Sequence, residues 1–250
     1  MLRFPPPTWF RETTFWPDTD DNWGNHQIVN ESVFATFNGS FYGLFRPPEL
    51  LIPSNYFRML EFPLGSPQGC LRSLGSRVAA EHNSATLRNM SNATGREALL
   101  TYARHRTAHV TMMLAGQRVA GWSACPARSQ PKSLVSVALQ RLKGFRFVGL
   151  TDEWALSVCL FHVMHGRRPC KGGELVNTRP SAVGNDAYLA SEILRAHQLI
   201  RGSADEILFV AARDRFWHDL RAWNVSEKVC ADLRCSKEAV GQTCSQPVPD

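Results

Sequence analysis

Lysine is scarce in this chain, and the glycine-rich loop that holds nucleotide phosphates is missing. Of the 28 basic residues 5 are lysines, and the first of these is Lys132. No Gly-x-x-x-x-Gly-Lys sequence occurs, so the standard lysine-containing phosphate cradle is absent. There is no basic run and no nucleic-acid-binding motif, which argues against nucleic acid as the partner. No apolar run is long enough to span a bilayer, and Met1 to Trp16 does not read as a signal peptide.

Arginine supplies most of the positive charge. The chain has 23 arginines and a formal net charge of +6. Guanidinium groups bind oxyanions bidentately, so this composition suits phosphate, sulfate or acidic glycans. The simpler interpretation is a solvated surface, because charges of both signs are interspersed. With 250 residues, 44% of them hydrophobic, the chain can bury one sizeable core.

Cysteines and glycosylation sequons point to an oxidising compartment. Seven cysteines leave at least one unpaired. The acceptor sequons are more numerous than chance predicts, and they begin at Asn30, Asn38, Asn89, Asn92 and Asn224. We therefore expect a protein of the secretory pathway. Without a leader in this sequence, either the sequons are incidental or the chain is part of a longer type II membrane protein.

Hydrophobic periodicity predicts strands that alternate with long helices. Apolar runs at 56–62 and 145–149 indicate strands buried on both faces. Helical periodicity covers 94–114, 132–142 and 185–200, and a capping box of Ser203 and Glu206 starts a last helix that reaches about Trp223. This order favours an α/β fold with a parallel sheet flanked by helices. We predict an irregular extension at 1–25, an α/β domain at 26–226 and a cysteine-containing tail at 227–250.

The most distinctive stretch is KGFRFVGLTDEWALSVCLFHVMHG, from Lys143 to Gly166. A short apolar strand leads into a helix for which Thr151 is the predicted cap. The predicted helix runs from Thr151 to His165 and buries a face that contains Trp154, Val158 and Phe161.

This strand-to-helix unit resembles a segment of the carbohydrate sulfotransferases, the group that includes heparan sulfate 2-O- and 6-O-sulfotransferases. Two further stretches are similar to family patterns: Thr111 to Gly116 to the end of NxQTRMLAG, and Asp205 to Phe209 with Phe216 to DxxLYxxAxxxF. The resemblance covers roughly Tyr56 to Trp223. It implies a P-loop-type three-layer fold, incomplete at its N-terminal end, in a glycoprotein of the Golgi lumen. The implied reaction transfers a sulfuryl group from 3'-phosphoadenosine 5'-phosphosulfate to a carbohydrate hydroxyl.

The resemblance also suggests site residues. In the family, an R[DE]PxxRxxS motif after an early strand binds the 3'-phosphate of the donor. With that strand placed at Tyr56 to Phe62, the best ligands here are Arg72 and Ser73, if residues 65–69 are an insertion. Thr111 is the residue retained from the polar positions of NxQTR, and we assign it to the cofactor site as well. His26 is the candidate catalytic base, and His82 is a weaker one.

No metal site is predicted. His162, His165 and Cys159 lie near one helix face, but no second ligand pair stands close in sequence.

Two functions remain open. The first is a sulfotransferase whose donor loop belongs to a longer chain, acting on a glycan or another hydroxyl-bearing acceptor. The second is a non-catalytic relative that binds an acidic glycan or a protein partner. A structure in which the segments at 56–62 and 145–149 are helical, or belong to separate sheets, would refute the resemblance.

Overall fold

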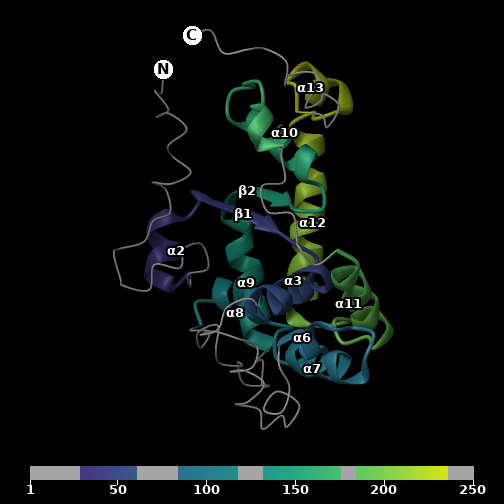
Figure 1. Cartoon of the computed structure of the whole chain (residues 1–250). Helices are drawn as coiled ribbons and strands as arrows, with labels where there is room; N and C mark the ends of the chain where they lie inside the picture. The colour runs from purple at the N-terminus through teal and green to yellow at the C-terminus, as the bar shows by residue number, and fades with distance from the viewer. Residues whose placement is uncertain (1–28, 61–83, 118–131, 176–183, 236–250) are drawn as a thin grey trace, which may run out of the picture.

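The computed structural model describes residues 29–60, 84–117, 132–175 and 184–235 (Figure 1). They form a mixed α/β structure that is mostly helical. Among these residues, no helix is both long enough and apolar enough to cross a membrane. The elements are α2 (Glu31–Phe37), β1 (Phe41–Phe45), α3 (Pro48–Leu60), α6 (Ser84–Arg88), α7 (Ala93–Arg104), α8 (His109–Leu114), α9 (Lys132–Lys143), β2 (Phe145–Leu150), α10 (Trp154–Met164), the 3-10 turn η1 (Gly172–Glu174), α11 (Gly184–Ala196), α12 (Ala204–Ala222) and α13 (Glu227–Asp232).

The sheet of the described residues is one parallel pair, β1 with β2. Phe41 lies opposite Phe145, and after a bulge the register continues from Tyr42 opposite Phe147 to Phe45 opposite Leu150. In Figure 1 the pair crosses the middle of the molecule, with α10 above it and α9 below it. The predicted strand at 145–149 is thus confirmed as β2, and its partner is parallel, as expected for an α/β fold.

The other predicted strand is wrong. Tyr56 to Leu60 is the last part of helix α3, and residues 61 and 62 lie outside the described ranges. The buried side chains Ile52, Tyr56, Phe57 and Leu60 recur at helical spacing, so they form one face that packs into a hydrophobic cluster with α6, α7 and α11. A short apolar run fits a buried helix as well as a strand, and here packing decided for the helix. One of the two strands expected from the resemblance is therefore helical, which counts against the resemblance.

The other helices lie close to their predicted positions. The predicted helix at 94–114 is divided into α7 and α8, and α9, α11 and α12 match the remaining predictions. Ser203 caps α12 as predicted, since its Oγ accepts the N–H of Glu206 at 3.2 Å. The Glu206 carboxylate accepts the N–H of Gly202, one residue earlier than a standard capping box requires.

Helix α10 is confirmed, but it begins at Trp154 with Glu153 at its N-cap, so Thr151 is not the cap that was predicted, and it buries a different face. Ser157, Cys159, Leu160 and Val163 are its buried residues, whereas Trp154 is 37% exposed. The reason lies in Ser157, whose Oγ accepts the N–H of Leu150 at 2.8 Å and donates to the Leu150 carbonyl at 2.9 Å. These two bonds fasten the first turn of α10 to the end of β2 and set the rotation of the helix.

Two disulfides join the C-terminal segment to the region of α10. Cys159 is bonded to Cys230 of α13, and Cys170 to Cys235. All four cysteines are buried in one small cluster with Val163. The predicted tail therefore begins with an ordered helix and two covalent links. The domain boundaries at 25/26 and 226/227 stay predictions.

Candidate functional site

Three of the four predicted site residues lie outside the described residues. These are His26, Arg72 and Ser73, and the weaker candidate His82 lies outside as well. The catalytic role of His26 and the phosphate-binding roles of Arg72 and Ser73 stay predictions, although the strand on which the register of Arg72 and Ser73 was based is helical.

Thr111 is in the described part, in α8, and it is 1% exposed. Its backbone N–H donates to Oδ1 of Asp205 at 2.8 Å, and the N–H of Val110 donates to Oδ2 at 3.2 Å. Ala108, at the N-cap of α8, has no side-chain acceptor to offer. The carboxylate of Asp205, from the start of α12, takes this role instead. The two stretches that carry the family resemblance, one containing Thr111 and the other containing Asp205, are thus in direct contact. This contact caps the start of α8.

The surroundings of Asp205 change its acidity. Burial raises the pKa of Asp205 from 3.8 to about 6, against the opposing effect of hydrogen bonds from Thr111, Val110 and His109. The carboxyl group is enclosed, and we assign it a structural role. The cofactor role of Thr111 stays a prediction.

A more open candidate site lies where the two parallel strands end. Arg46 follows β1 directly, and Thr151 and Asp152 follow β2. The N–H of Thr151 donates to the Phe45 carbonyl at 2.9 Å, so the two strand ends are held side by side. In parallel α/β sheets, ligands bind beyond the carboxyl ends of the strands. This edge therefore brings an arginine, a hydroxyl and a carboxylate to a position suited to a ligand.

Charge at this edge is partly balanced. Arg46 is half-buried, and burial lowers the pKa of its guanidinium, while the negative charge of Asp152 acts in the opposite direction. An arginine remains charged despite such a shift, because its ordinary pKa is far above neutral. Glu49, in the first turn of α3, has its own partner in Arg195 of α11 at 3.8 Å. Asp152 is thus the carboxylate with which an anionic ligand would compete for Arg46.

This position is not among the site residues predicted from the sequence. With β1 as the early strand, the R[DE]PxxRxxS pattern fits Arg46, Pro48 and Ser54 at its own spacing, without an insertion. Pro47 replaces the acidic residue of the pattern and Leu51 replaces its second arginine. The available signal was the short aromatic and apolar run FYGLF immediately before Arg46, because aromatic residues favour strands.

Comparisons of the chain with protein-family models, with curated proteins and with solved structures found no match. The residues and their geometry are therefore the basis for any functional proposal.

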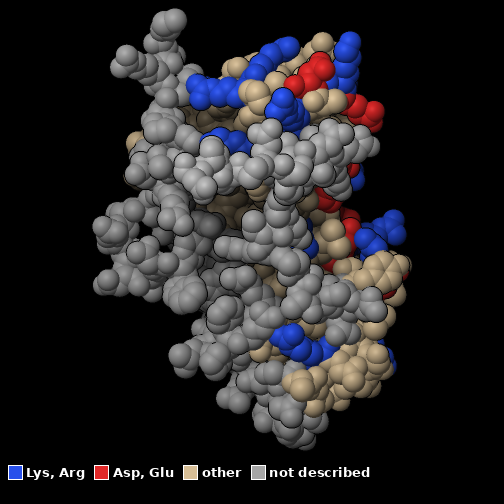
Figure 2. Space-filling view, turned by 45° about the horizontal axis from the view of Figure 1, so that its top comes forward, with Lys and Arg blue, Asp and Glu red and all other residues tan. Residues whose placement is uncertain are grey.

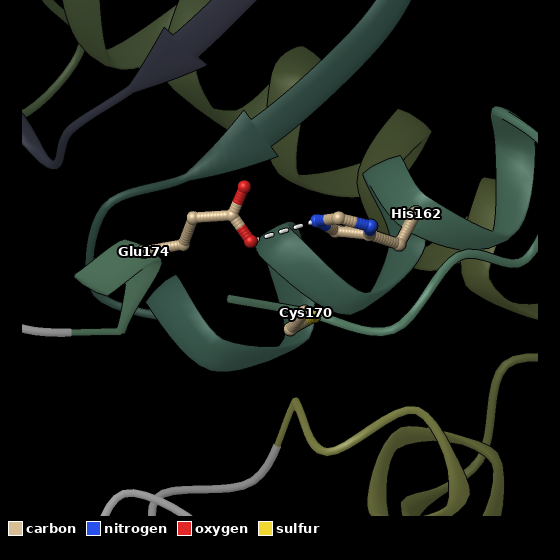
Figure 3. A group of neighbouring side chains, drawn as sticks. All are labelled: His162, Cys170 and Glu174. Atoms are coloured by element: carbon tan, nitrogen blue, oxygen red, sulfur yellow. Dashed lines mark hydrogen bonds and ion pairs between the residues drawn. The ribbon is translucent and has the colours of Figure 1, made fainter. Parts of the chain in front are cut away.

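A second group of polar side chains lies beside α10 (Figure 3). Nε2 of His162 is 2.9 Å from Oε2 of Glu174, and Cys170 lies next to both. The sulfur of Cys170 is bonded to Cys235 and is not a thiolate. In this oxidised state the group holds η1 against α10.

Cys159 and His165, which were considered with His162 as possible metal ligands from the sequence, have other partners. Cys159 is in the disulfide with Cys230. Nδ1 of His165 is 2.8 Å from the Phe161 carbonyl, so Nδ1 carries the proton, and Nε2 accepts the hydroxyl of Tyr42 at 3.0 Å. Burial lowers the pKa of His165, which favours this neutral form. His165 thus links the end of α10 to β1.

The surface charges of the described residues are mixed. In the view of Figure 2, lysine and arginine side chains stand in small groups with aspartate and glutamate between them. This distribution agrees with the interspersed charges of the sequence.

Proposed function

We propose that the protein is sulfotransferase-like and that its 3'-phosphate site is the connection between β1 and α3. The observation that carries the proposal is the placement of Arg46 at the carboxyl end of a parallel strand, directly before the helix that contains Ser54. The proposal includes a P-loop-type three-layer fold, of which β1, β2 and the helices around them would form one part. The ligand is 3'-phosphoadenosine 5'-phosphosulfate or its product, 3'-phosphoadenosine 5'-phosphate.

The chemistry of this site is oxyanion binding. The guanidinium of Arg46 offers charge-assisted hydrogen bonds to two phosphate oxygens, and the hydroxyl of Ser54 can donate one more. Thr151 stands at the neighbouring strand end. The carboxylate of Asp152 weakens the attraction of this edge for a phosphate, because its negative charge already acts on Arg46.

Two departures from the family pattern limit the strength of donor binding. Leu51 stands in place of the second arginine, and no lysine-containing cradle is present in the sequence. Charge-assisted hydrogen bonds contribute about 1.5–3 kcal/mol each, so two missing groups weaken donor binding by about two to four powers of ten. We therefore propose that residues 1–250 alone bind the donor weakly and transfer no sulfuryl group to heparan or chondroitin acceptors. An active enzyme would need a cradle from a longer chain.

The alternative is a non-catalytic scaffold that binds an acidic glycan. The surplus of arginine over lysine supports it, as does the missing cradle. A lumenal, glycosylated protein is common to both proposals. The two disulfides of the described residues are in keeping with such a compartment.

Ligand-observed NMR with 3'-phosphoadenosine 5'-phosphate can test the proposed site, because saturation transfer detects dissociation constants on the order of 1 mM, which correspond to about −4 kcal/mol. We expect a signal with the wild-type chain, and its loss in Arg46→Ala and Ser54→Ala. Asp152→Asn should strengthen binding up to about fivefold, since an exposed charge pair contributes about 0–1 kcal/mol. Arg213→Ala, an exposed arginine in α12, is the matched control.

The same measurement separates the two registers of the phosphate motif. If Arg72→Ala abolishes the signal and Arg46→Ala leaves it unchanged, the site lies in the segment first predicted. If the wild-type chain gives no signal, donor binding is refuted. Retention of the chain on a heparin column would then favour the scaffold.

A further inference from the structure

His162, Cys170 and Glu174 bring three different metal-ligand atoms together. One ring nitrogen, one sulfur and one carboxylate oxygen all lie within 4.8 Å of one another (Figure 3). It is the one such group among the residues that the structure describes. Cys170 is 8% exposed, and the His162 and Glu174 side chains are 12% and 38% exposed. The group is thus enclosed on the Cys170 side and reachable from solvent on the Glu174 side.

Contacts that do not involve the disulfide hold two of the three ligands. Oε2 of Glu174 accepts the backbone N–H of Lys171 at 2.7 Å, and the Glu174 carbonyl accepts the indole N–H of Trp154 at 2.7 Å. His162 is part of helix α10 and pairs directly with Glu174. Opening the bond between Cys170 and Cys235 would therefore leave the imidazole and the carboxylate in place. Such supporting hydrogen bonds also orient the ligands in natural metal sites.

We propose that reduction of the disulfide between Cys170 and Cys235 converts this group into a Zn²⁺ site. A dithiol gives up two electrons and two protons and becomes a disulfide itself, or a phosphine and one water molecule become the phosphine oxide and two protons; with either reductant the disulfide between Cys170 and Cys235 becomes two thiols. Zn²⁺ then binds the Cys170 sulfur, the thiol proton leaves to solvent, and Nε2 of His162 binds in the tautomer that carries its proton on Nδ1. The disulfide and the metal are alternative occupants of Cys170, because a sulfur bonded to Cys235 is not a thiolate ligand.

Geometry and charge both suit zinc. Zn–N and Zn–O distances of about 2.0–2.2 Å and a Zn–S distance of about 2.3 Å place tetrahedral ligands about 3.3–3.7 Å apart. The separations from the Cys170 sulfur need a contraction of about 1 Å at most, and Nε2 of His162 and Oε2 of Glu174, now 2.9 Å apart, must move apart slightly. Rotations of the Cys170 and Glu174 side chains can supply both changes once the disulfide opens. One thiolate and one carboxylate balance the charge of the ion, so the loaded site is neutral, and a partly buried site favours that. In the Cys235→Ser protein water would take the fourth position, as in zinc sites with three protein ligands, whereas in the reduced wild-type chain the Cys235 thiol is freed beside Cys170 and can take that position.

The other disulfide provides a matched comparison. Cys159 and Cys230 are also buried, but neither belongs to a group of three ligands among the described residues. A free thiol at Cys159 should therefore bind zinc no better than an isolated cysteine.

The experiment uses the full chain with Cys70, Cys125 and Cys244 changed to serine, so that the four cysteines of the two disulfides remain. This triple serine variant is the parent protein. In it, Cys235→Ser leaves Cys170 as a free thiol, and Cys230→Ser leaves Cys159 as a free thiol. A third variant of the parent combines Cys235→Ser with His162→Ala. Zn²⁺ is titrated in competition with a chromophoric chelator at pH 7.5. Co²⁺ then replaces it, because a thiolate-to-cobalt charge-transfer band reports a sulfur ligand directly.

We expect one Zn²⁺ per chain in the Cys235→Ser protein, with a cobalt–thiolate band, and no binding in the parent. Combination with His162→Ala should weaken zinc binding at least tenfold, and Cys230→Ser should behave like the parent. The proposal is overturned if Cys235→Ser fails to bind zinc, or if Cys230→Ser binds it equally well. Should circular dichroism show that Cys235→Ser loses helix, the phosphine-reduced parent takes its place. Its Tm must then rise with Zn²⁺, and an unchanged Tm would refute the site.

Discussion

Asp205 gives the sharpest test of the packing between α8 and α12. Asp205→Ala removes the acceptor for two N–H groups, that of Thr111, which is buried, and that of Val110, which is partly buried. An unsatisfied buried donor costs about 1–3 kcal/mol, so the variant should lose about 2–5 kcal/mol of stability when the wild-type carboxyl group is protonated. Asp205→Asn keeps one acceptor oxygen and should lose less.

The pH dependence of this loss has a definite sign. The folded-state pKa of Asp205, about 6, lies above its value of 3.8 in an unfolded chain. A raised pKa means that folding binds the proton more tightly, so the contribution of Asp205 to stability is complete below pH 4 and falls as the pH rises to 6. A shift of about 2 units corresponds to about 3 kcal/mol. The difference between wild type and Asp205→Ala should therefore shrink by up to about 3 kcal/mol between pH 4 and pH 7.

Urea unfolding of both proteins at pH 4, 5, 6 and 7 measures this difference, and other titrating groups cancel when they are distant. Asp214→Ala, at an exposed position of the same helix, is the control and should show no such trend. A difference that grows with pH would refute the reasoning. It would mean that the hydrogen bonds outweigh burial and hold the pKa of Asp205 below its ordinary value.

Three further outcomes follow from the described contacts. Arg141→Met removes hydrogen bonds from a buried guanidinium to two backbone carbonyls and to the exposed Glu31 carboxylate. Because the buried carbonyls lose their donor while water can reach Glu31, the variant should cost about 1–3 kcal/mol and speed amide hydrogen exchange in α2 most, as mass spectrometry can show. Ser157→Ala leaves the N–H and C=O of Leu150 without their side-chain partner and should lower the free energy of unfolding by about 1–3 kcal/mol, in contrast to an exposed serine inside a helix such as Ser136 of α9. The protein can be expressed in a eukaryotic secretory host with a supplied signal peptide, and peptide mapping should then find glycans at the four exposed sequons. We expect none at Asn92, because its side-chain amide donates a hydrogen bond to an α6 carbonyl at 3.4 Å. A chain with no glycan at any sequon would mean that the sequons are incidental.

Several elements were decided by local signals in the sequence. The run from Phe145 to Leu150 and the helix after it carry β-branched and aromatic residues, a turn and acidic residues at the helix start, all within one short stretch. Capping of α12 by Ser203 is equally local, since the acceptor and the donor are three residues apart. Such features depend on neighbours in the chain, and for this reason they could be predicted without a partner surface.

Tertiary packing decided the candidate site. The apolar run around Tyr56 and Phe57 is too short for its hydrophobic pattern to distinguish a buried helix from a buried strand. Packing against α7 and α11 favours the helix. The strand that does pair with β2 is the short FYGLF run, whose identity as a strand depends on a partner more than 100 residues away. Placing the early strand at Tyr56 to Phe62 led to the prediction of Arg72 and Ser73, whereas β1 as the early strand leads to the proposal of Arg46 and Ser54.

The sequence by itself determined the composition of this protein, its missing lysine cradle, its sequons and the strand-to-helix unit at Lys143 to Gly166. The structure alone decided which cysteines pair, which face of α10 is buried, and that His162, Cys170 and Glu174 meet. Disulfide pairing, burial of a helix face and ligand geometry each depend on residues that lie far apart in the chain or on different helical turns. They are therefore determined by the packing of the whole domain.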